Sequence, residues 1–416
     1  MMLNTKNPEP ARMTRTFLFS GALFSALLWA LLRGGSHAAT PAASAAGSLT
    51  PEQQLTDAIE QLQSGRAQEA LKNLRALTHS EPEFRLGQLM YGELLAAMSG
   101  AGGGTLLAAA DNGDPRIKDL AEEARLRLAS EKAVPPTGAV PSNILQLSRS
   151  HKYVVIVDLP RARLYLMENR DGELRLLRHQ YAAMGRNGYG KQASGDLRTP
   201  VGVYHVTGWI NDNKLPELYG AGAFPVSYPN PWDVFKKRSG NGIWLHGVPR
   251  NTYSRPPRSS EGCVTMANAD LLALKPYIRL GETPVILSDN VEWLDKNVTS
   301  EDREDWLGRI EAWRGRWSAK DTEAYLAYYG EDFTAEGMNR AQFVEHKRRV
   351  NAAKKFIEVK LSDVNLFRYP GAGEPLLLAE FTMDYQSDNY SSHAQKQQFW
   401  RKEKNGEWKI FREENR

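Results

Sequence analysis

The residues best suited to chemistry lie in two short segments. Residues 243–248 read Ile-Trp-Leu-His-Gly-Val and carry His246 at the end of a strand-like run, while residues 260–266 read Ser-Glu-Gly-Cys-Val-Thr-Met and carry Cys263. A thiol becomes a competent nucleophile when a base or a local positive potential raises its thiolate fraction, and a histidine can supply both. Gly262 lets the backbone approach a substrate closely, so we expect the amides of Gly262 and Cys263 to face the oxyanion of a tetrahedral intermediate. Together the two segments predict cysteine-based acyl transfer.

A β-rich stretch surrounds both segments. From Lys152 onwards, short runs of branched and aromatic residues alternate with loops rich in Gly, Pro and Asn, and such loops commonly carry functional residues. Asp171-Gly172 is a hairpin signal between two of these runs. The expected strands are 153–157, 164–167, 174–181, 202–209, 242–246 and 284–287. We therefore expect a mainly β domain over residues 150–290.

Helical periodicity precedes this domain. Apolar residues recur at steps of three and four from Leu55 to Leu77, with Gly65 at a break, which predicts a helical hairpin. Further helices are expected over 84–98 and 115–132, and the spacing of several residues resembles one tetratricopeptide repeat: Ala58, Ala70, Leu74 and Pro82. One such repeat is not an array. We expect a small helical domain over residues 49–133 that packs or forms a homodimer, followed by a Pro-rich linker over residues 134–149.

A third region, residues 291–416, begins with a helical pattern and ends in strands. Helical spacing of aromatic residues is followed by a predicted helix over 340–354 and by predicted strands over 357–364, 376–385, 395–402 and 408–411. Helices followed by antiparallel strands indicate an α+β domain. The aromatic residues could line a ligand pocket, but at helical spacing we expect them to form core: Trp306, Trp313, Trp317, Tyr325 and Tyr328.

The N-terminus has the pattern of an export signal. Lys6, Arg12 and Arg15 precede an uncharged apolar run from Phe17 to Leu32, and small residues follow at Ser36-His37-Ala38. The run is short for a spanning helix, which needs about 20 apolar residues. We expect residues 1–38 to be a cleaved signal, with an uncleaved membrane anchor as the alternative, and residues 39–48 to be a spacer. Either way the remaining chain is expected in the periplasm.

Export sharpens the interpretation of the single cysteine. Exported chains usually carry an even set of cysteines for disulfides, whereas Cys263 is the only one here and no intramolecular disulfide can form. A lone thiol in an oxidising space is a liability unless it is buried or used. The alternative to a nucleophile is a small buried hydrophobic side chain.

Other classes of site have little support. The chain is 41% hydrophobic and 25% charged with a net charge of +4, which is typical of soluble globular protein, and its bases form no stripe with interleaved aromatics, so nucleic acid is not an expected partner. Four histidines lack metal-ligand spacing and are expected at the surface or in satisfied positions: His151, His179, His205 and His393. We assign no metal and no cofactor.

The two segments resemble a known family. His-Gly, a spacer, then Ser-x-Gly-Cys followed by Val-x-Met resembles the L,D-transpeptidase catalytic domain, and residues 195–204, preceded by Met184-Gly185, resemble its Thr-Pro-x-Gly strand entry. The resemblance covers residues 150–290 and implies a β-rich fold that acts on peptidoglycan stem peptides. It implies Cys263 as nucleophile and His246 as general base and then acid. It further implies Gly262 in the oxyanion loop, with Ser260 and Gly247 shaping the site.

Two positions depart from the family pattern. Most members carry His before the Gly-Cys pair and Arg two residues after the cysteine, where this chain has Glu261 and Thr265. Glu261 is therefore expected to reshape specificity. The variant resembles a subgroup that includes cell-shape L,D-carboxypeptidases of helical bacteria and enzymes that detach lipoprotein from murein. The carboxypeptidases join this domain to an N-terminal helical dimerisation region and a C-terminal nuclear-transport-factor-like domain, which the pattern of residues 291–416 fits.

The resemblance implies a ping-pong reaction on stem tetrapeptides. Cys263 attacks the carbonyl between the third and fourth residues, D-alanine leaves, and the thioester passes to an acceptor. We expect an amine as acceptor, which gives transpeptidation. The alternatives are water, which gives L,D-carboxypeptidase activity, release of murein-bound lipoprotein, and a non-catalytic scaffold that binds murein.

Overall fold

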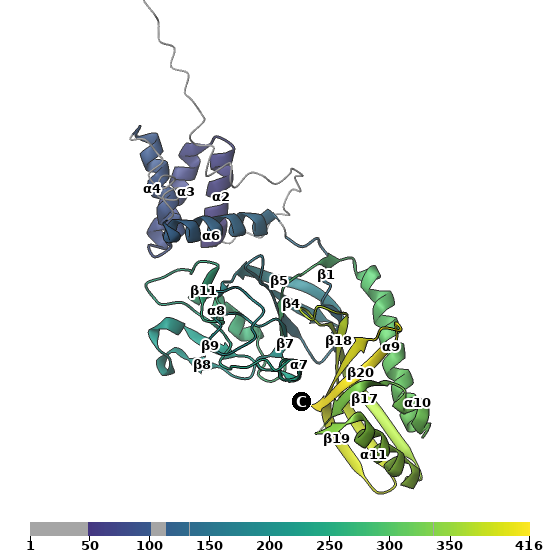
Figure 1. The fold of residues 1–416 in the computed structure, drawn as a ribbon. Coiled ribbons are helices and arrows are strands. Elements are labelled where there is room, and N and C mark those ends of the chain that lie inside the picture. Colours follow the sequence, from purple (N-terminus) through teal and green to yellow (C-terminus); the bar gives the residue numbers. More distant parts are fainter. Residues whose placement is uncertain (1–48, 101–113, 133, 336) are drawn as a thin grey trace, which may run out of the picture.

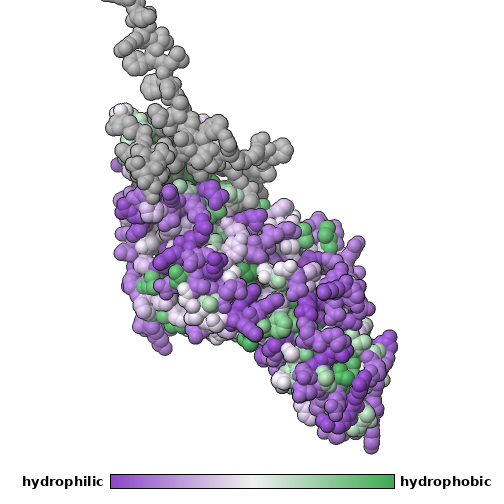
Figure 2. All heavy atoms as spheres, in the orientation of Figure 1, coloured by the Kyte–Doolittle hydropathy of each residue, from purple (hydrophilic) through white to green (hydrophobic). Residues whose placement is uncertain are grey.

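A computed structural model describes residues 49–100, 114–132, 134–335 and 337–416 (Figure 1). The expected export segment 1–38, the spacer 39–48 and Gly102–Gly104 lie outside the described residues. Within the described ranges, none of the helices has the length and apolar character needed to cross a bilayer. The visible face is mainly hydrophilic, with hydrophobic residues in small scattered patches (Figure 2). The multidomain fold class is confirmed, with N-terminal helices, a β-rich centre and a C-terminal α+β region.

The helical region closely follows the predicted pattern. Thr50 and Gln53 form a capping box at the start of the first helix, and Gly65, at a φ of 73°, separates it from the second. The apolar faces of the helices in this region pack into one core that includes Leu55, Leu74 and Phe84. The helices are α2 (Pro51–Gln63), α3 (Ala67–Ser80), α4 (Arg85–Met98) and α6 (Pro115–Lys132). The expected homodimer through this region stays a prediction.

The β-rich centre is built on a five-stranded sheet. Its order is β5-β4-β3-β13-β7, and β3 and β13 are parallel neighbours at its middle. Asp171 and Gly172, both at positive φ (55° and 96°), close the predicted hairpin between β4 and β5. The strands are β3 (Tyr153–Asp158), β4 (Arg163–Arg170), β5 (Glu173–Tyr181), β7 (Gly202–His205) and β13 (Pro284–Ser288).

A second, smaller sheet carries the candidate site. Its order is β12-β10-β9-β8, and beside it β6 and β11 form a two-stranded parallel ladder. Its apolar face shares one hydrophobic core with the five-stranded sheet. These strands are β6 (Met184–Gly185), β8 (Ile210–Asn211), β9 (Gly222–Pro225), β10 (Trp244–His246), β11 (Arg258–Ser260) and β12 (Val264–Thr265); the helices are α7 (Pro231–Phe235) and α8 (Asn268–Leu274).

The C-terminal region wraps a strongly bent sheet around its helices (Figure 1). The sheet has the order β16-β15-β20-β19-β18-β17-β2. Trp313, Trp317 and Tyr325 are buried between α9 and this sheet, which confirms that the aromatic residues form core. The elements are α9 (Lys296–Ser318), α10 (Thr322–Leu326), β15 (Tyr329–Ala335), β16 (Met338–Asn339), α11 (Arg340–Ala353), β17 (Ile357–Arg368), β18 (Leu376–Ser387), β19 (Ser391–Lys402) and β20 (Trp408–Asn415).

The segment predicted as a linker, residues 134–149, differs from the expectation because it contains two strands. β1 (Val140–Pro141) pairs with β14 (Trp293–Leu294). β2 (Ile144–Gln146) pairs with β17 and becomes an edge strand of the C-terminal sheet. Alternation is hard to recognise in so short a strand, and its pairing partner lies more than two hundred residues further along the chain.

Buried charges join the helical region to the β-rich centre. Glu52 of α2 accepts hydrogen bonds from Arg127 of α6 at 2.8 Å and from Arg163 of β4 at 2.7 Å. Arg127 also donates to Glu123 at 2.8 Å and lies over the ring of Tyr181, 3.9 Å from its centroid. Because removing one partner leaves a buried charge uncompensated, this network ties the two regions firmly together.

Candidate active site

Strands β10 and β12 place both candidate catalytic residues on one face of a sheet. The strands are parallel, with Leu245 opposite Val264 and His246 opposite Thr265. Leu245 and Val264 point into the hydrophobic core. Side chains alternate along a strand, so His246 and Cys263, which directly precedes β12, point to the opposite face. The register thus places the two residues that the sequence singled out on the same face of neighbouring strands.

His246 is oriented by the carbonyl next to it. Its Nδ1 atom lies 2.7 Å from the carbonyl oxygen of Gly247, and because a carbonyl only accepts, Nδ1 carries the proton. Nε2 is therefore the nitrogen with the free lone pair. A Cβ atom on Gly247 would lie 2.1 Å from Oδ1 of Asn268, which explains why glycine is needed at this position.

Asn268 holds the turn that supplies this carbonyl. Its Oδ1 accepts hydrogen bonds from the amides of Ala221 at 2.9 Å and Val248 at 3.1 Å, and its Nδ2 donates to the carbonyl of Val248 at 2.8 Å. Three bonds from one side chain position the backbone on both sides of the turn. The sequence analysis did not identify Asn268, because nothing in its local pattern marks a contact with residues 221 and 248.

The surroundings of Cys263 favour its thiol form. The side chain is partly exposed. Its Sγ donates to the carbonyl of Gly242 at 3.4 Å, and burial raises its pKa to about 11. Burial likewise lowers the pKa of His246 to about 4. The thiol therefore needs a base at the moment of attack.

Ser260 shapes the nucleophile loop through two hydrogen bonds. Its Oγ donates to the carbonyl of Cys263 at 2.6 Å and accepts from the amide of Gly262 at 3.1 Å. The Gly262 amide is thus occupied within the loop and does not face an oxyanion, contrary to expectation. The amide of Cys263 is the backbone donor that we assign to that role. Glu261 is exposed at the rim of the site.

The second family-like motif packs directly against this loop. Gly262 has a φ of 129°, and a Cβ atom there would lie 2.9 Å from the carbonyl oxygen of Arg198. The amide of Gly185 donates to Oγ1 of Thr199 at 2.9 Å, and the amide of Arg186 donates to the carbonyl of Ser260 at 2.7 Å. The two motifs therefore build one site, with residues 185–199 forming the wall behind the nucleophile.

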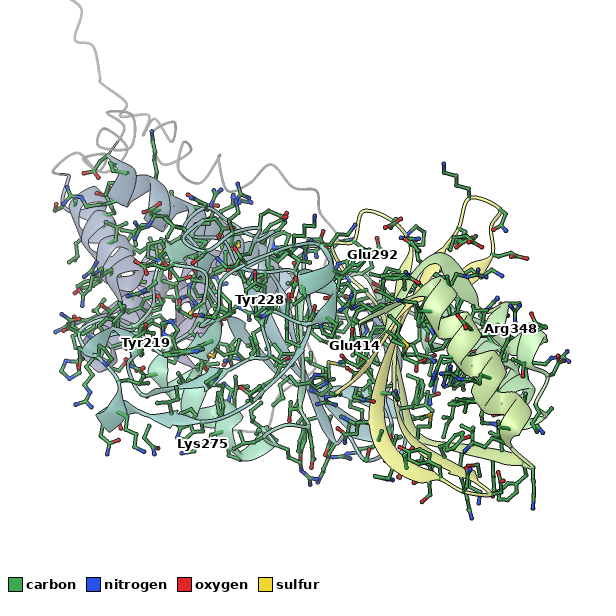
Figure 3. The ribbon with its side chains drawn as sticks, turned by 60° about the horizontal axis from the view of Figure 1, so that its bottom comes forward. Tyr219, Tyr228, Lys275, Glu292, Arg348 and Glu414 are labelled. Atoms are coloured by element: carbon green, nitrogen blue, oxygen red, sulfur yellow. The ribbon has the colours of Figure 1, made fainter. Side chains whose placement is uncertain are left out.

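An aromatic pair lies beside His246. The ring of Tyr219 stands 4.8 Å from the imidazole, centroid to centroid, and 5.0 Å from the ring of Trp244. Tyr219 lies on the side of the β-rich domain away from the C-terminal domain (Figure 3). The Tyr219 ring also excludes water from one side of the imidazole, which fits the lowered pKa of His246. Tyr219 ends a short 3-10 turn, Glu217–Tyr219, which has no regular sequence pattern, so it could not be recognised from the sequence.

The connecting loop, residues 247–259, is held by the helical region. The ring of Tyr253 lies 4.3 Å from that of Phe84, and its amide donates to the carbonyl of Glu83 at 3.2 Å. Ser254 donates to Glu123 at 2.8 Å. Arg258 donates to Glu122 at 2.8 Å. The loop that joins the histidine to the cysteine therefore rests on α6 and on the start of α4.

Of the four histidines that lack metal-ligand spacing, His179 and His393 lie in paired positions, as expected. Nδ1 of His179 accepts from Arg163 at 2.9 Å, and Nδ1 of His393 lies 2.6 Å from Asp384. His205 differs because it is buried at the boundary with the C-terminal sheet, with Nε2 3.2 Å from Glu380. Among the described residues, no cluster of His, Cys, Asp and Glu is arranged to hold a metal ion.

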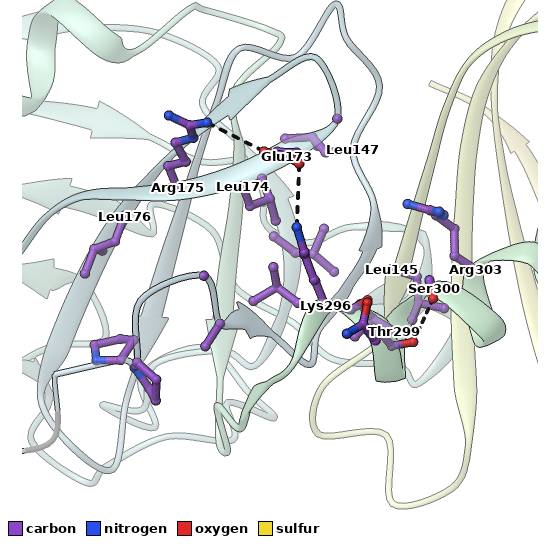
Figure 4. A pocket seen from close by; sticks show the side chains of 18 of the residues that line it. Leu145, Leu147, Glu173, Leu174, Arg175, Leu176, Lys296, Thr299, Ser300 and Arg303 are labelled. Carbon is purple, nitrogen blue, oxygen red and sulfur yellow. Dashed lines mark hydrogen bonds and ion pairs between the residues drawn. The ribbon is translucent and has the colours of Figure 1, made fainter.

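A cavity of about 780 Å³ lies away from the candidate site. It is lined by residues 134–140, by the start of β5 and by the first turns of α9, where Lys296 reaches toward Glu173 at 3.8 Å (Figure 4). Neither Cys263 nor His246 contributes to its wall. The chemistry described above therefore belongs to the face of the β10–β12 sheet that carries His246 and Cys263, and not to this cavity.

Two known domains match the chain. The L,D-transpeptidase catalytic domain matches residues 152–287, a range that includes both Cys263 and His246. The Cds6 C-terminal NTF2-like domain matches residues 305–414. No curated protein matches the chain significantly.

Solved structures agree with this arrangement. Bd1075 of Bdellovibrio bacteriovorus is 31% identical, with a TM-score of 0.59 over 67% of this chain and 98% of Bd1075. The helical cell shape determining protein Pgp2 of Campylobacter jejuni is 24% identical, with a TM-score of 0.54 over 68% of this chain and 96% of Pgp2, and shows a similar fold. From its sequence, its architecture and its identity to Bd1075, the chain belongs to the L,D-transpeptidase family and joins the family's catalytic domain to a C-terminal NTF2-like domain.

Proposed function

We propose that the protein is a cysteine acyl-transfer enzyme that acts on the stem tetrapeptides of bacterial peptidoglycan. One observation carries the proposal: Cys263 and His246 point to the same face of adjacent parallel strands, and the Gly247 carbonyl leaves Nε2 of His246 free as a base. Membership of the L,D-transpeptidase family supports the substrate class. From the signal-like residues 1–38, we further propose that the enzyme works in the periplasm.

The proposed reaction begins with rotation of the thiol away from the Gly242 carbonyl. Nε2 of His246 takes the thiol proton as Sγ bonds to the carbonyl carbon between the third and fourth stem residues. The amide of Cys263 faces the oxyanion. The imidazolium then donates its proton to the leaving amine as the carbon–nitrogen bond breaks, which releases D-alanine and leaves a thioester. His246 then deprotonates the acceptor, which attacks the thioester carbonyl. The carbon–sulfur bond breaks, and the imidazolium returns the proton to Sγ.

The charge around the thiol favours water as the acceptor. Arg255 and Lys191 are close enough to Cys263 to oppose the rise of its pKa that burial causes. An amine acceptor is an ammonium ion at neutral pH and is repelled by these cations, whereas water is not. Glu261 acts in the opposite direction, and Lys191 is paired with Asp196 at 2.7 Å, so the repulsion comes mainly from Arg255. We therefore propose tetrapeptide trimming, as by an L,D-carboxypeptidase, as the second candidate beside transpeptidation.

Product analysis by mass spectrometry tests both candidate reactions, transpeptidation and tetrapeptide trimming. The purified protein and Cys263→Ala are incubated with disaccharide tetrapeptide and with cross-linked murein fragments. Cysteine-dependent tripeptide supports trimming, and new dimers linked between third residues support transpeptidation. If neither forms, murein carrying bound lipoprotein is the next substrate. No cysteine-dependent product from any of the three would reject catalysis in favour of a murein-binding scaffold.

A further inference from the structure

Two guanidinium groups beside the candidate nucleophile have no counter-ion. Across the described part of the chain, the side chains of Arg186 and Arg255 form no ion pair and no hydrogen bond, although Arg255 is half-buried. Other arginines of the same domain are paired with carboxylates: Arg178 with Asp270 at 2.8 Å, Arg238 with Asp233 at 2.9 Å, Arg250 with Asp212 at 3.1 Å and Arg258 with Glu122 at 2.8 Å. Arg186 and Arg255 therefore differ from these four arginines in having no carboxylate partner.

Backbone hydrogen bonds bring these two arginines together at the nucleophile loop. The hydroxyl of Tyr181 donates to the carbonyl of Arg255 at 2.9 Å, and the amide of Met184 donates to the carbonyl of Pro257 at 2.8 Å. The amide of Arg186 donates to the carbonyl of Ser260 at 2.7 Å. The segment 181–186 thus runs beside the segment 255–260, which leads directly into Gly262 and Cys263.

Electrostatics agrees with this proximity. Burial lowers the pKa of Arg255, and the charge of Arg186 lowers it further, while Cys263 and Glu261 act in the opposite direction. Arg255 in turn opposes the burial-driven rise in the pKa of Cys263. Glu261 is exposed and forms no ion pair with either arginine. Two like charges held together beside a nucleophile form a site that an anionic ligand would complete.

The connecting loop presents Arg255 from a fixed base. Tyr253 and Ser254 on one side, and Arg258 on the other, contact Phe84, Glu123 and Glu122 of the helical region. Because the contacts flank Arg255 on both sides, the loop can change its position only if it breaks from the helical region. A guanidinium that is already in place loses less conformational freedom when it binds a ligand.

We propose that Arg255, together with Arg186, binds the free C-terminal carboxylate of the donor peptide. Arg255 is then a specificity-determining residue. The inference rests on the proposed function, in which the leaving residue carries the only main-chain carboxylate of a linear peptide. Guanidinium and carboxylate groups form paired, charge-assisted hydrogen bonds.

The test compares a stem tetrapeptide that ends in a free carboxylate with the same peptide ending in an amide. The full-length wild type is compared with Arg255→Gln and with the matched control Arg250→Gln, which alters an exposed cation on the same loop. We expect Arg255→Gln to lower kcat/KM for the acid by about tenfold to a hundredfold and to leave the amide within about twofold. Arg255→Lys should restore part of the preference, and Arg250→Gln should retain it fully.

Binding gives a readout that does not depend on turnover. In the Cys263→Ala background, calorimetry should show tighter binding of the acid than of the amide, and Arg255→Gln should remove the difference. Equal losses for both peptides, or an unchanged preference, would overturn the subsite. If the wild type cleaves neither peptide but Cys263→Ala still discriminates between them through Arg255, the proposed reaction fails and the subsite stands.

Discussion

The Nδ1 atom of His246 donates to the carbonyl of Gly247 at 2.7 Å, so a backbone atom takes the place that a carboxylate holds in many catalytic triads. A neutral carbonyl orients the imidazole without adding a negative charge beside it. Burial therefore lowers the pKa of His246 with little opposition. The pair begins as neutral thiol and neutral imidazole, and charge develops only during attack.

This relationship predicts an unusually acid-tolerant enzyme. The pKa of His246 is lowered to about 4, so its neutral, basic form persists to lower pH than that of an ordinary histidine. We expect kcat/KM for a stem tetrapeptide to stay nearly constant from about pH 8 to about pH 5 and to fall only as the pH approaches 4. An acidic limb with a midpoint above about pH 6 would contradict this assignment. Substrate titration is controlled for by repeating the profile with a peptide whose side-chain carboxylates are amidated.

Alkylation reports on the resting thiol. Because burial raises the pKa of Cys263 to about 11, the thiolate fraction should climb by about tenfold per pH unit across the range from about pH 7 to pH 10. Iodoacetamide labelling followed by mass spectrometry should therefore show no plateau in that range.

The His246→Ala variant separates two origins of reactivity. In the resting site the thiol donates to Gly242 and not to the imidazole, so we expect the variant to keep the alkylation profile of the wild type while turnover is lost. A large drop in alkylation at neutral pH in His246→Ala would instead reveal a resting thiolate–imidazolium pair.

Asn268 should matter for turnover although it touches no reacting atom. Asn268→Ala removes the three hydrogen bonds that hold residues 221 and 248 around the Gly247 turn. A displaced Gly247 carbonyl misorients the imidazole, and a shift of about 1 Å can cost about a hundredfold in rate. We expect kcat to fall by about that factor with KM nearly unchanged. Asn251→Ala, at an exposed position of the connecting loop, is the control and should retain activity.

Glu52 should make stability depend on pH. Burial disfavours its ionised form, but Arg127 and Arg163 outweigh that effect and hold the pKa below its usual 4.5. A lowered carboxyl pKa adds stability above pH 4.5 that is lost as the pH falls through the folded-state value. Glu52→Gln should lower the free energy of unfolding by about 3 kcal/mol near neutral pH. It should also flatten the pH dependence of that free energy in the acid range.

Denaturant unfolding at several pH values measures this effect. Glu69→Gln is the matched control, because Glu69 pairs with Arg66 only at the surface and should change stability by less than about 1 kcal/mol. If both variants behave alike, the buried network does not join the helical region to the β-rich centre as described.

Elements with a strong local signal were predictable from the sequence. Apolar periodicity and the break at Gly65 place the first two helices correctly, and Asp171-Gly172 marks the turn between two strands. The His246 and Cys263 segments are short motifs in which the chemistry itself restricts the residue types. In each case neighbours along the chain carry the information.

Features that depend on distant contacts were not predictable. Asn268 acts on residues 221 and 248, Tyr219 meets His246 across the sheet, and Arg255 is positioned by helices that precede it by more than a hundred residues. Burial decides the pKa of Cys263, and burial is a property of the folded chain. The strand β2 was missed for the same reason, since its partner β17 lies in another domain.

The position of β2 makes the C-terminal domain discontinuous. The chain contributes one edge strand to that domain's sheet, then builds the whole β-rich centre, and returns for the remaining six strands. A fragment that stops at residue 290 leaves the buried side chain of Leu145 without its partners in the C-terminal core. A fragment that starts at residue 291 leaves the edge of β17 open to other chains. In this chain the sheet of the NTF2-like unit is therefore complete only when residues 144–146, which precede the catalytic domain, are present.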